Sequence, residues 1–298
     1  MRQPRFRTST RVRWWSGVLV AVLAVVVIVL VVLAFQRTRG GAPVEQSPRP
    51  VPSFSPSPDE TPSPTATPTA TPTPVVITAP GAEERFLSAG SGALWRATAG
   101  ACGGTEPLLE RSTDEGRTWN DVTPRYLGIG QILSLNAFAG TEAQLVALMG
   151  ADCEVQGLRT FTQGRFWEPN AEVLAGATYL VPDGAEVITP SGRVEAPCDA
   201  PWGVRAGGGA TALVCDGIAY TLVDDEWEQV AENALAVALQ SGAVVTAAVA
   251  PGCNGITISG VASTCVQVES PSAPSAITTS GPNTLIWALD TLETVATP

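Results

Sequence analysis

Few side chains of this chain can carry acid–base chemistry. Its 298 residues include no His, and all seventeen basic residues are Arg, so Lys is absent too. These absences exclude Ser/His/Asp and Cys/His catalysis, zinc bound through imidazole, Schiff-base chemistry and a Walker-type phosphate loop. A catalytic acid or base must therefore be Asp, Glu or Tyr, and the only Tyr are Tyr126, Tyr179 and Tyr220.

Cysteine spacing indicates disulfides rather than a metal site. The six Cys contain no Cys-x-x-Cys pair, whereas structural zinc sites usually show close paired spacings. Six Cys allow fifteen connectivities, so pairing is inferred from position along the chain. We expect no metal and no cofactor, and we expect three bridges: Cys102 with Cys153, Cys198 with Cys215, and Cys253 with Cys265.

One run of acidic residues has the composition of a cation site. Asp224, Asp225 and Glu226 are consecutive, and clustered carboxylates suit calcium. Three acids between two apolar runs are also typical of a solvated hairpin tip, because Asp tolerates the backbone of tight turns. We favour the turn, and we interpret Glu83 and Glu84 as a similar surface feature.

Residues 112–119 fit the pattern Ser-x-Asp-x-Gly-x-Thr-Trp at every defined position. In a tight turn the Asp carboxylate accepts backbone N–H bonds, the Gly takes a positive φ, and the last two residues begin the returning strand. The pattern therefore predicts a structural turn rather than an active site. Its defined residues are Ser112, Asp114, Gly116, Thr118 and Trp119.

These residues resemble the Asp box of the bacterial neuraminidase repeats and related β-propellers. The resemblance implies a propeller over roughly residues 75–298, with the box in a peripheral turn. Sialidases of this kind use an arginine cluster, a Tyr nucleophile partnered by Glu, and an Asp acid. The family's Arg-Ile-Pro motif is absent from this sequence, and no Tyr has a sialidase context, so no catalytic residue is carried over. The resemblance is to a non-catalytic member.

Weaker copies of the box support the propeller. Residues 160–167 repeat it forty-eight positions later without the Asp, and residues 220–227 are a fainter copy that turns at Asp224 and Asp225. Repeated units of this length predict an all-β propeller of about six short blades, within a range of five to seven. A β-sandwich is the main competitor. The blades should begin near Arg85, Gln131, Ala177, Trp202, Ala234 and Ser275.

Two further predictions concern the packing of the blades. The last unit is one strand short, so we expect the β-branched run at residues 75–78 to complete it and close the ring. Trp95, Trp202 and Trp287 lie in predicted strands, and we expect them to pack within blades. An exposed pair of these rings would instead indicate a sugar-stacking platform.

The amino-terminal part of the chain predicts a membrane anchor. Residues 14–35 are uncharged and apolar, long enough as a helix to cross a bilayer, and Arg residues are more numerous before them than after. A cleaved signal peptide is the alternative, and either outcome exports the rest of the chain. We therefore divide the chain into a cytoplasmic basic tail (1–13), a transmembrane signal-anchor helix (14–35), a disordered linker rich in Pro, Ser and Thr (36–74) and an extracytoplasmic propeller (75–298).

The charge of the predicted domain limits its partners. From residue 81 onward nine Arg stand against twenty-five Asp and Glu, a net charge of −16. Nucleic acids and anionic lipids require clustered positive charge, so we expect neither as a ligand of this domain. We expect a cell-surface module that binds a protein or cell-wall glycan without catalysis. The alternatives are a sialidase-like glycoside hydrolase and an assembly factor for a membrane complex.

Overall fold

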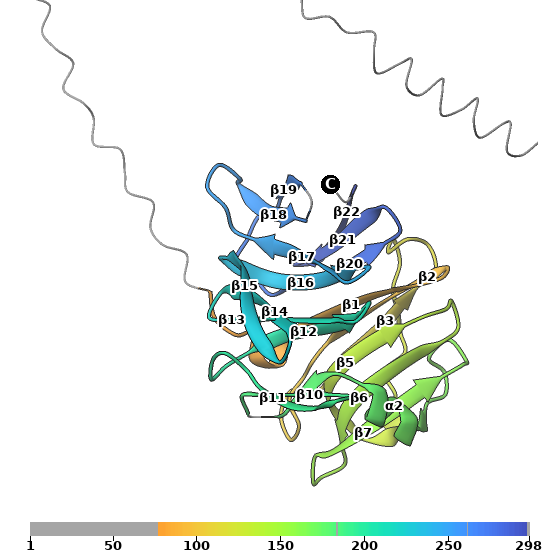
Figure 1. Ribbon diagram of the computed structural model, residues 1–298. Helices are drawn as coiled ribbons and strands as arrows, with labels where there is room; N and C mark the ends of the chain where they lie inside the picture. The colour runs from red at the N-terminus through yellow and green to blue at the C-terminus, as the bar shows by residue number, and fades with distance from the viewer. Residues whose placement is uncertain (1–76, 183, 261, 297–298) are drawn as a thin grey trace, which may run out of the picture. The chain divides into compact units, whose positions relative to one another are not determined.

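The computed structural model describes residues 77–182, 184–260 and 262–296, which form an all-β domain of six sheets. Within each sheet the strands are antiparallel, and neighbours in the sheet are neighbours in sequence. Tight turns containing residues with positive φ, such as Asp216 and Gly217, join many of the strands. We call the sheets blades 1 to 6 in chain order (Figure 1).

The first three blades occupy residues 85–195. Blade 1 contains β1 (Arg85–Gly90), β2 (Ala93–Thr98), β3 (Leu108–Ser112) and β4 (Asn120–Asp121). Blade 2 contains β5 (Ile129–Ala137), β6 (Ala143–Met149), β7 (Glu154–Thr160) and β8 (Glu168–Pro169). Blade 3 is smaller and contains β9 (Tyr179–Leu180), β10 (Glu186–Thr189) and β11 (Gly192–Glu195).

The remaining blades complete the domain. Blade 4 contains β12 (Trp202–Gly207), β13 (Ala210–Cys215), β14 (Ile218–Val223) and β15 (Glu226–Glu232). Blade 5 contains β16 (Ala234–Gln240), β17 (Ala243–Ala248), β18 (Gly255–Ser259) and β19 (Ser263–Gln267). Blade 6 contains β20 (Ser275–Ser280), β21 (Asn283–Ala288) and β22 (Thr291–Ala296). The described helices are η1 (Gly81–Glu83), η2 (Arg125–Leu127) and α2 (Ala171–Gly176).

The six sheets form a closed ring. The first strand of each blade packs against the first strand of the next, and β20 of blade 6 packs against β1 of blade 1. Apolar side chains therefore meet between neighbouring blades, where they form the core clusters. This arrangement is a six-bladed β-propeller, as the sequence predicts, and every inner strand begins within two residues of its predicted start.

The predicted closing strand is wrong for the two of its residues that the structure describes. Ile77 and Thr78 lie in no strand, and blade 6 has three strands within the described residues. Ile77 instead packs against the apolar clusters on either side of blade 5. The seam between blades 6 and 1 is held by Arg85, whose guanidinium lies 4.3 Å from the ring centroid of Trp287 and donates to the Leu289 carbonyl at 2.6 Å.

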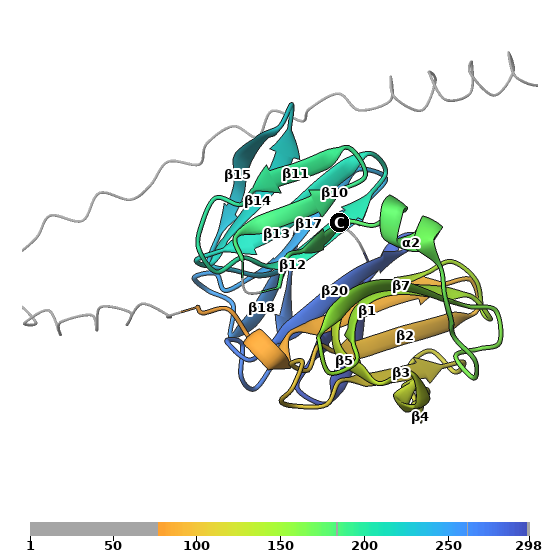
Figure 2. The same cartoon turned by 90° about the horizontal axis from the view of Figure 1, so that it is seen from below.

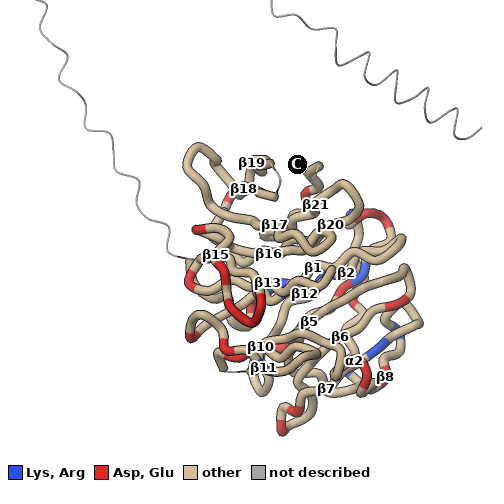
Figure 3. Tube along the Cα trace, in the orientation of Figure 1, with Lys and Arg blue, Asp and Glu red and all other residues tan. Residues whose placement is uncertain are grey.

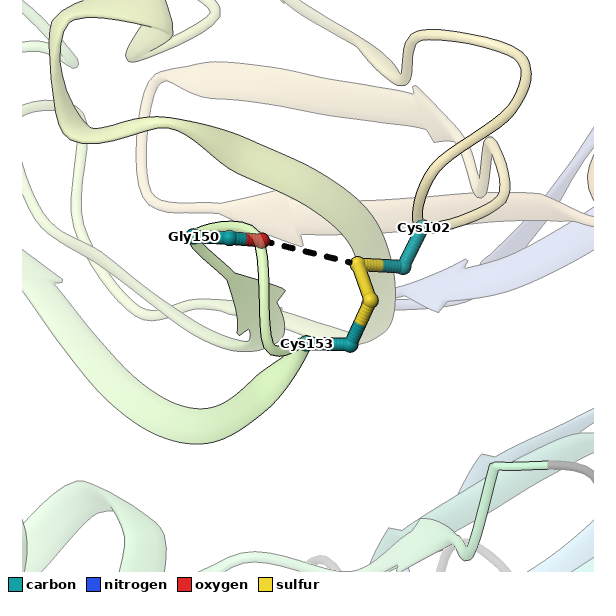
Figure 4. Close-up of a disulfide and its surroundings, with 3 residues drawn as sticks. All are labelled: Cys102, Gly150 and Cys153. Carbon is teal, nitrogen blue, oxygen red and sulfur yellow. Dashed lines mark hydrogen bonds between the residues drawn. A yellow bond between two sulfur atoms is a disulfide. The ribbon is translucent and has the colours of Figure 1, made fainter.

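Three disulfides are present, and they join the pairs expected from position: Cys102–Cys153, Cys198–Cys215 and Cys253–Cys265. The first links a loop of blade 1 to the β6–β7 turn of blade 2, where the Sγ of Cys102 lies 3.8 Å from the carbonyl oxygen of Gly150 (Figure 4). This bridge links two neighbouring blades covalently.

Two expectations concern residues outside the described part of the chain. Residues 14–35 and 36–74, expected to be the anchor and the linker, both precede residue 77. Among the described residues, no helix has the length and apolar character needed to cross a membrane.

Candidate functional site

The predicted Asp-box residues form a structural turn between β3 and β4. Asp114 accepts hydrogen bonds from the Thr118 backbone N–H at 2.9 Å and the Thr118 hydroxyl at 2.7 Å, and Ser112 donates to it at 2.8 Å. These bonds, led by those from Thr118, lower the pKa of Asp114 to about 2. Gly116 has a φ of 86° and lies against Leu292 of blade 6, leaving no room for a larger residue. The turn therefore stabilises the ring.

The degenerate copy at residues 160–167 builds the same turn without an acid. Thr160 accepts from the Gly164 N–H at 3.2 Å, as Ser112 accepts from Gly116 in blade 1 at 2.9 Å. Thr162 replaces Asp114 and accepts from the Phe166 N–H at 2.9 Å. A hydroxyl therefore performs the structural task of the carboxylate.

The fainter copy at residues 220–227 is a hairpin without a box. Asp224 and Asp225 both have positive φ and form the tip between β14 and β15. Acidic residues continue along the exposed β15 edge (Figure 3). Among the described residues, no group of three or more His, Cys, Asp or Glu is placed to hold a metal ion.

None of the three tyrosines lines the cavity of about 400 Å³ that opens at the central channel. Tyr126 accepts from the Trp167 N–H at 2.6 Å and donates to the Trp167 carbonyl at 3.2 Å. Tyr179 is buried, and this burial raises the pKa of its phenol. Tyr220 packs against the cluster between blades 3 and 4. None is positioned as a nucleophile at the channel.

Trp95, Trp202 and Trp287, expected to pack within blades, are buried. Trp95 is fully enclosed between blades 1 and 2, where it meets Trp167 edge-on with ring centroids 6.2 Å apart. Trp202 donates its indole N–H to the Leu235 carbonyl at 3.1 Å. Trp287 lies beneath the guanidinium groups of Arg85 and Arg96. These rings form no exposed platform.

A cavity of about 400 Å³ opens where the inner strands end around the channel. It extends outward over the face of blade 2, and α2, which leads into blade 3, forms the facing wall. Asn170 caps α2 by accepting from the Val173 N–H at 3.0 Å, and the absence of a side chain at Gly157 lets α2 approach β7 closely (Figure 2). We call this space the blade 2–3 cleft.

Three charged residues line the cleft, and one of them is held in the channel by other contacts. Arg205 donates to the carbonyls of Arg85 and Val204 at 2.9 and 2.8 Å, and its guanidinium lies 4.9 Å from the ring of Phe86. Burial lowers its pKa from the usual value, against the influence of Glu84. The other two charged lining residues are Arg159 and Glu172.

Glu84, expected at the surface, belongs instead to the channel. It lines a second cavity of about 100 Å³ that shares Arg205 with the first, and its carboxylate accepts from the Gly203 N–H at 2.9 Å. Desolvation raises its pKa above the ordinary value, while Arg205 and the Gly203 bond oppose that rise. Part of Glu84 is still accessible to solvent. Arg205 therefore separates the cleft from Glu84.

One row of polar side chains distinguishes the cleft. Asn136, Gln144 and Arg159 are direct cross-strand partners on β5, β6 and β7, and all three line the cavity. The side chains of Asn136 and Gln144 form no hydrogen bond with any described residue. Arg159 contacts Glu142 at 3.5 Å, and its buried Nε has no partner among the described residues. We call these three residues the blade 2 row.

Sequence reasoning missed the blade 2 row because nothing in its residue types marks it. A signal was available in the forty-eight-residue offset between the two boxes, which places Ser88 over Asn136 and Arg111 over Arg159. The two repeats thus share the Arg but differ on the innermost strand, where blade 1 has Ser88 and blade 2 has Asn136.

Comparison with known proteins identifies no family. No family model matches the chain, and no curated protein is similar to it. Solved structures that match part of the chain include YCF48 bound to D1 peptide (14% identity, 71% of this chain, 76% of that chain, TM-score 0.37). Others are YCF48 from Cyanidioschyzon merolae (12%, 68%, 62%, 0.26) and the GH43_1 enzyme from Xanthomonas citri (10%, 71%, 82%, 0.35). At these identities and scores, the six-bladed assignment rests on the sheet topology.

Proposed function

We propose that this propeller is a non-catalytic binding module that takes its ligand in the blade 2–3 cleft. The observation that carries this proposal is the blade 2 row. Asn136 and Gln144 present amide donors and acceptors to a cavity of about 400 Å³ without using them inside the described fold. Unused hydrogen-bonding groups converging in a cavity of this size are the usual mark of a ligand site.

The distribution of carboxylates supports binding rather than hydrolysis. Glycoside hydrolysis generally uses two carboxyl groups on either side of the scissile bond. Among the described residues, Glu172 is the only carboxylate that lines the cleft, and Glu84 faces the separate cavity beyond Arg205. This arrangement offers no facing acid and base.

We further propose that the domain is displayed outside the cell membrane by residues 14–35, with the first thirteen residues in the cytoplasm. Three disulfides among six cysteines support an oxidising compartment. Protease added to intact cells should remove the propeller and leave the amino-terminal tag of a tagged chain protected. Loss of that tag, or full protection of the propeller, would contradict this location.

The non-catalytic proposal is tested by measuring turnover with the full-length chain. Chromogenic glycosides and sialosides should be released no faster than in buffer, and Glu172→Gln should change nothing. A turnover that Glu172→Gln abolishes and Glu186→Gln preserves would overturn the proposal, because Glu186 lies on β10 outside the cleft. The sialidase-like alternative would then be favoured.

A further inference from the structure

We infer that the ligand of the blade 2–3 cleft is an uncharged, extended glycan chain that lies across the blade 2 row from the channel towards the rim. This inference rests on the proposed binding function and adds the chemistry of the ligand. It depends on three observations: the spacing of the amides in the cleft, the exposed aromatic rings beside Arg159, and the charge balance of the cleft.

The row matches a repeating polyhydroxylated ligand. Asn136 and Gln144 each carry an amide oxygen that accepts and an amide nitrogen that donates two protons. Such a group pairs with adjacent hydroxyls, or with an acetamido group, through two hydrogen bonds. Neighbouring strands lie about 4.8 Å apart, which is close to the length of one sugar ring with its linkage. Successive strands therefore place one polar side chain opposite each successive sugar.

Exposed aromatic surface lies beside Arg159, just outside the residues that line the cavity. Phe138 and Phe161 are 40% and 49% exposed, although both are large apolar side chains. The guanidinium of Arg159 lies 4.2 Å from the ring centroid of Phe161 and 5.9 Å from that of Phe138, so it contacts both rings. A sugar has an apolar C–H face, and covering the rings with it would remove apolar surface from water.

The charges of the cleft favour a neutral ligand. Arg159 is accompanied by Glu142 at 3.5 Å and by Glu172 among the lining residues, while Arg205 is bound to two carbonyls near Glu84. No net positive charge is left to attract an anion. The domain as a whole, with a net charge of −16 from residue 81 onward, repels anionic polymers.

A peptide fits the cleft less well. Peptides commonly add to a free sheet edge or fill an apolar groove. The blade 2 row lies on a sheet face, because its residues are partners within β5, β6 and β7. The row also offers two amides and a guanidinium where a helix or a Pro-rich segment would require apolar contacts.

The experiment is calorimetric titration of the full-length chain in neutral detergent. The probes are cellohexaose, chitohexaose, xylohexaose and mannohexaose, with hexagalacturonate and an acetylated, amidated Gly/Ser hexapeptide for comparison. We expect saturable binding of at least one uncharged sugar, little dependence on salt, and no binding of hexagalacturonate or peptide. Binding of chitohexaose alone would identify acetamido groups as the recognised feature.

Variants locate the site. Asn136→Ala combined with Gln144→Ala should weaken sugar binding tenfold or more, and Phe161→Ala should weaken it severalfold. Gln229→Ala is the matched control, since Gln229 is an exposed amide on β15, and it should bind as the parent chain does. Unchanged thermal unfolding of each variant excludes misfolding as the cause.

The possible failures are distinguishable. If only hexagalacturonate or the peptide binds, and the double variant abolishes it, the binding function stands and the neutral-glycan inference is overturned. If no uncharged sugar binds, or if the double variant binds as the control does, the inference is also overturned. Turnover that depends on Glu172 would instead remove the proposed function itself.

Discussion

Blades 1 and 2 carry equivalent rows of side chains. The row of blade 1 is mostly covered by the next blade, and the row of blade 2 is open. In blade 1 the row is Ser88, Trp95 and Arg111, which are direct cross-strand partners. Ser88 accepts from the Ala137 N–H at 2.9 Å, Arg111 donates to the Gly140 carbonyl at 3.0 Å, and Trp95 is fully buried. Blade 2 covers most of this row, whereas its own row is left open.

The difference originates in blade 3. Blade 2 is covered by β9, which is only two residues long, and apolar contact there is limited to the part of the face around Tyr179. The part of the blade 2 face that carries the row is instead separated from α2 by the cleft. A shortened blade in a ring of similar blades thus exposes a surface that is elsewhere part of the core. We propose that the polar row at that surface serves binding, because it is not needed for packing.

Replacing the central residue of each row should give the largest contrast. Trp95→Ala leaves a large cavity between blades 1 and 2 and should lower the free energy of unfolding by about 3–5 kcal/mol. Gln144→Ala, at the corresponding open position, should change it by no more than about 0.5 kcal/mol. Guanidinium chloride unfolding measures both. Equal losses would show that the blade 2 row is packed like the blade 1 row.

Removing the bridge between the two blades should have an effect of similar size on stability and none on the cleft. The Cys102–Cys153 bridge spans 51 residues, and the loop-entropy model gives it a stabilising contribution of about 4 kcal/mol. Replacing both cysteines with Ala should lower the unfolding free energy by that order. Sugar binding at a temperature where the variant remains folded should be unchanged. Weakened binding there would mean that the bridge shapes the cleft.

The two box turns should differ only in their response to acid. The pKa of Asp114 in the folded chain is about 2, below its ordinary value of 3.8, so its stabilising effect is present above about pH 4 and is lost as the pH falls towards 2. Asp114→Asn should flatten the fall of the melting temperature over this range. Thr162→Ser, in the blade 2 turn, should leave it unchanged because no titrating group is altered. Identical profiles for the Asn variant and the parent would contradict this role of Asp114.

The sequence predicted what depends on local pattern. The turn at residues 112–119, the starts of the inner strands and the pairing of Cys198 with Cys215 follow from turn residues, alternation and position along the chain. The closing strand failed because the destination of Ile77 depends on the space between distant blades. The cleft was missed for the same kind of reason. Asn136 and Gln144 become notable only because a neighbouring blade is too short to cover them.

The central claim is that the blade 2 row is a ligand site, and a crystal structure of the full-length chain with the tightest-binding uncharged hexasaccharide tests it most directly. We expect the sugar in the blade 2–3 cleft, with hydrogen bonds to Asn136 and Gln144 and a ring against Phe161. A sugar bound elsewhere, such as in the groove between blades 6 and 1 near Asn283, with the blade 2 row empty, would contradict the account.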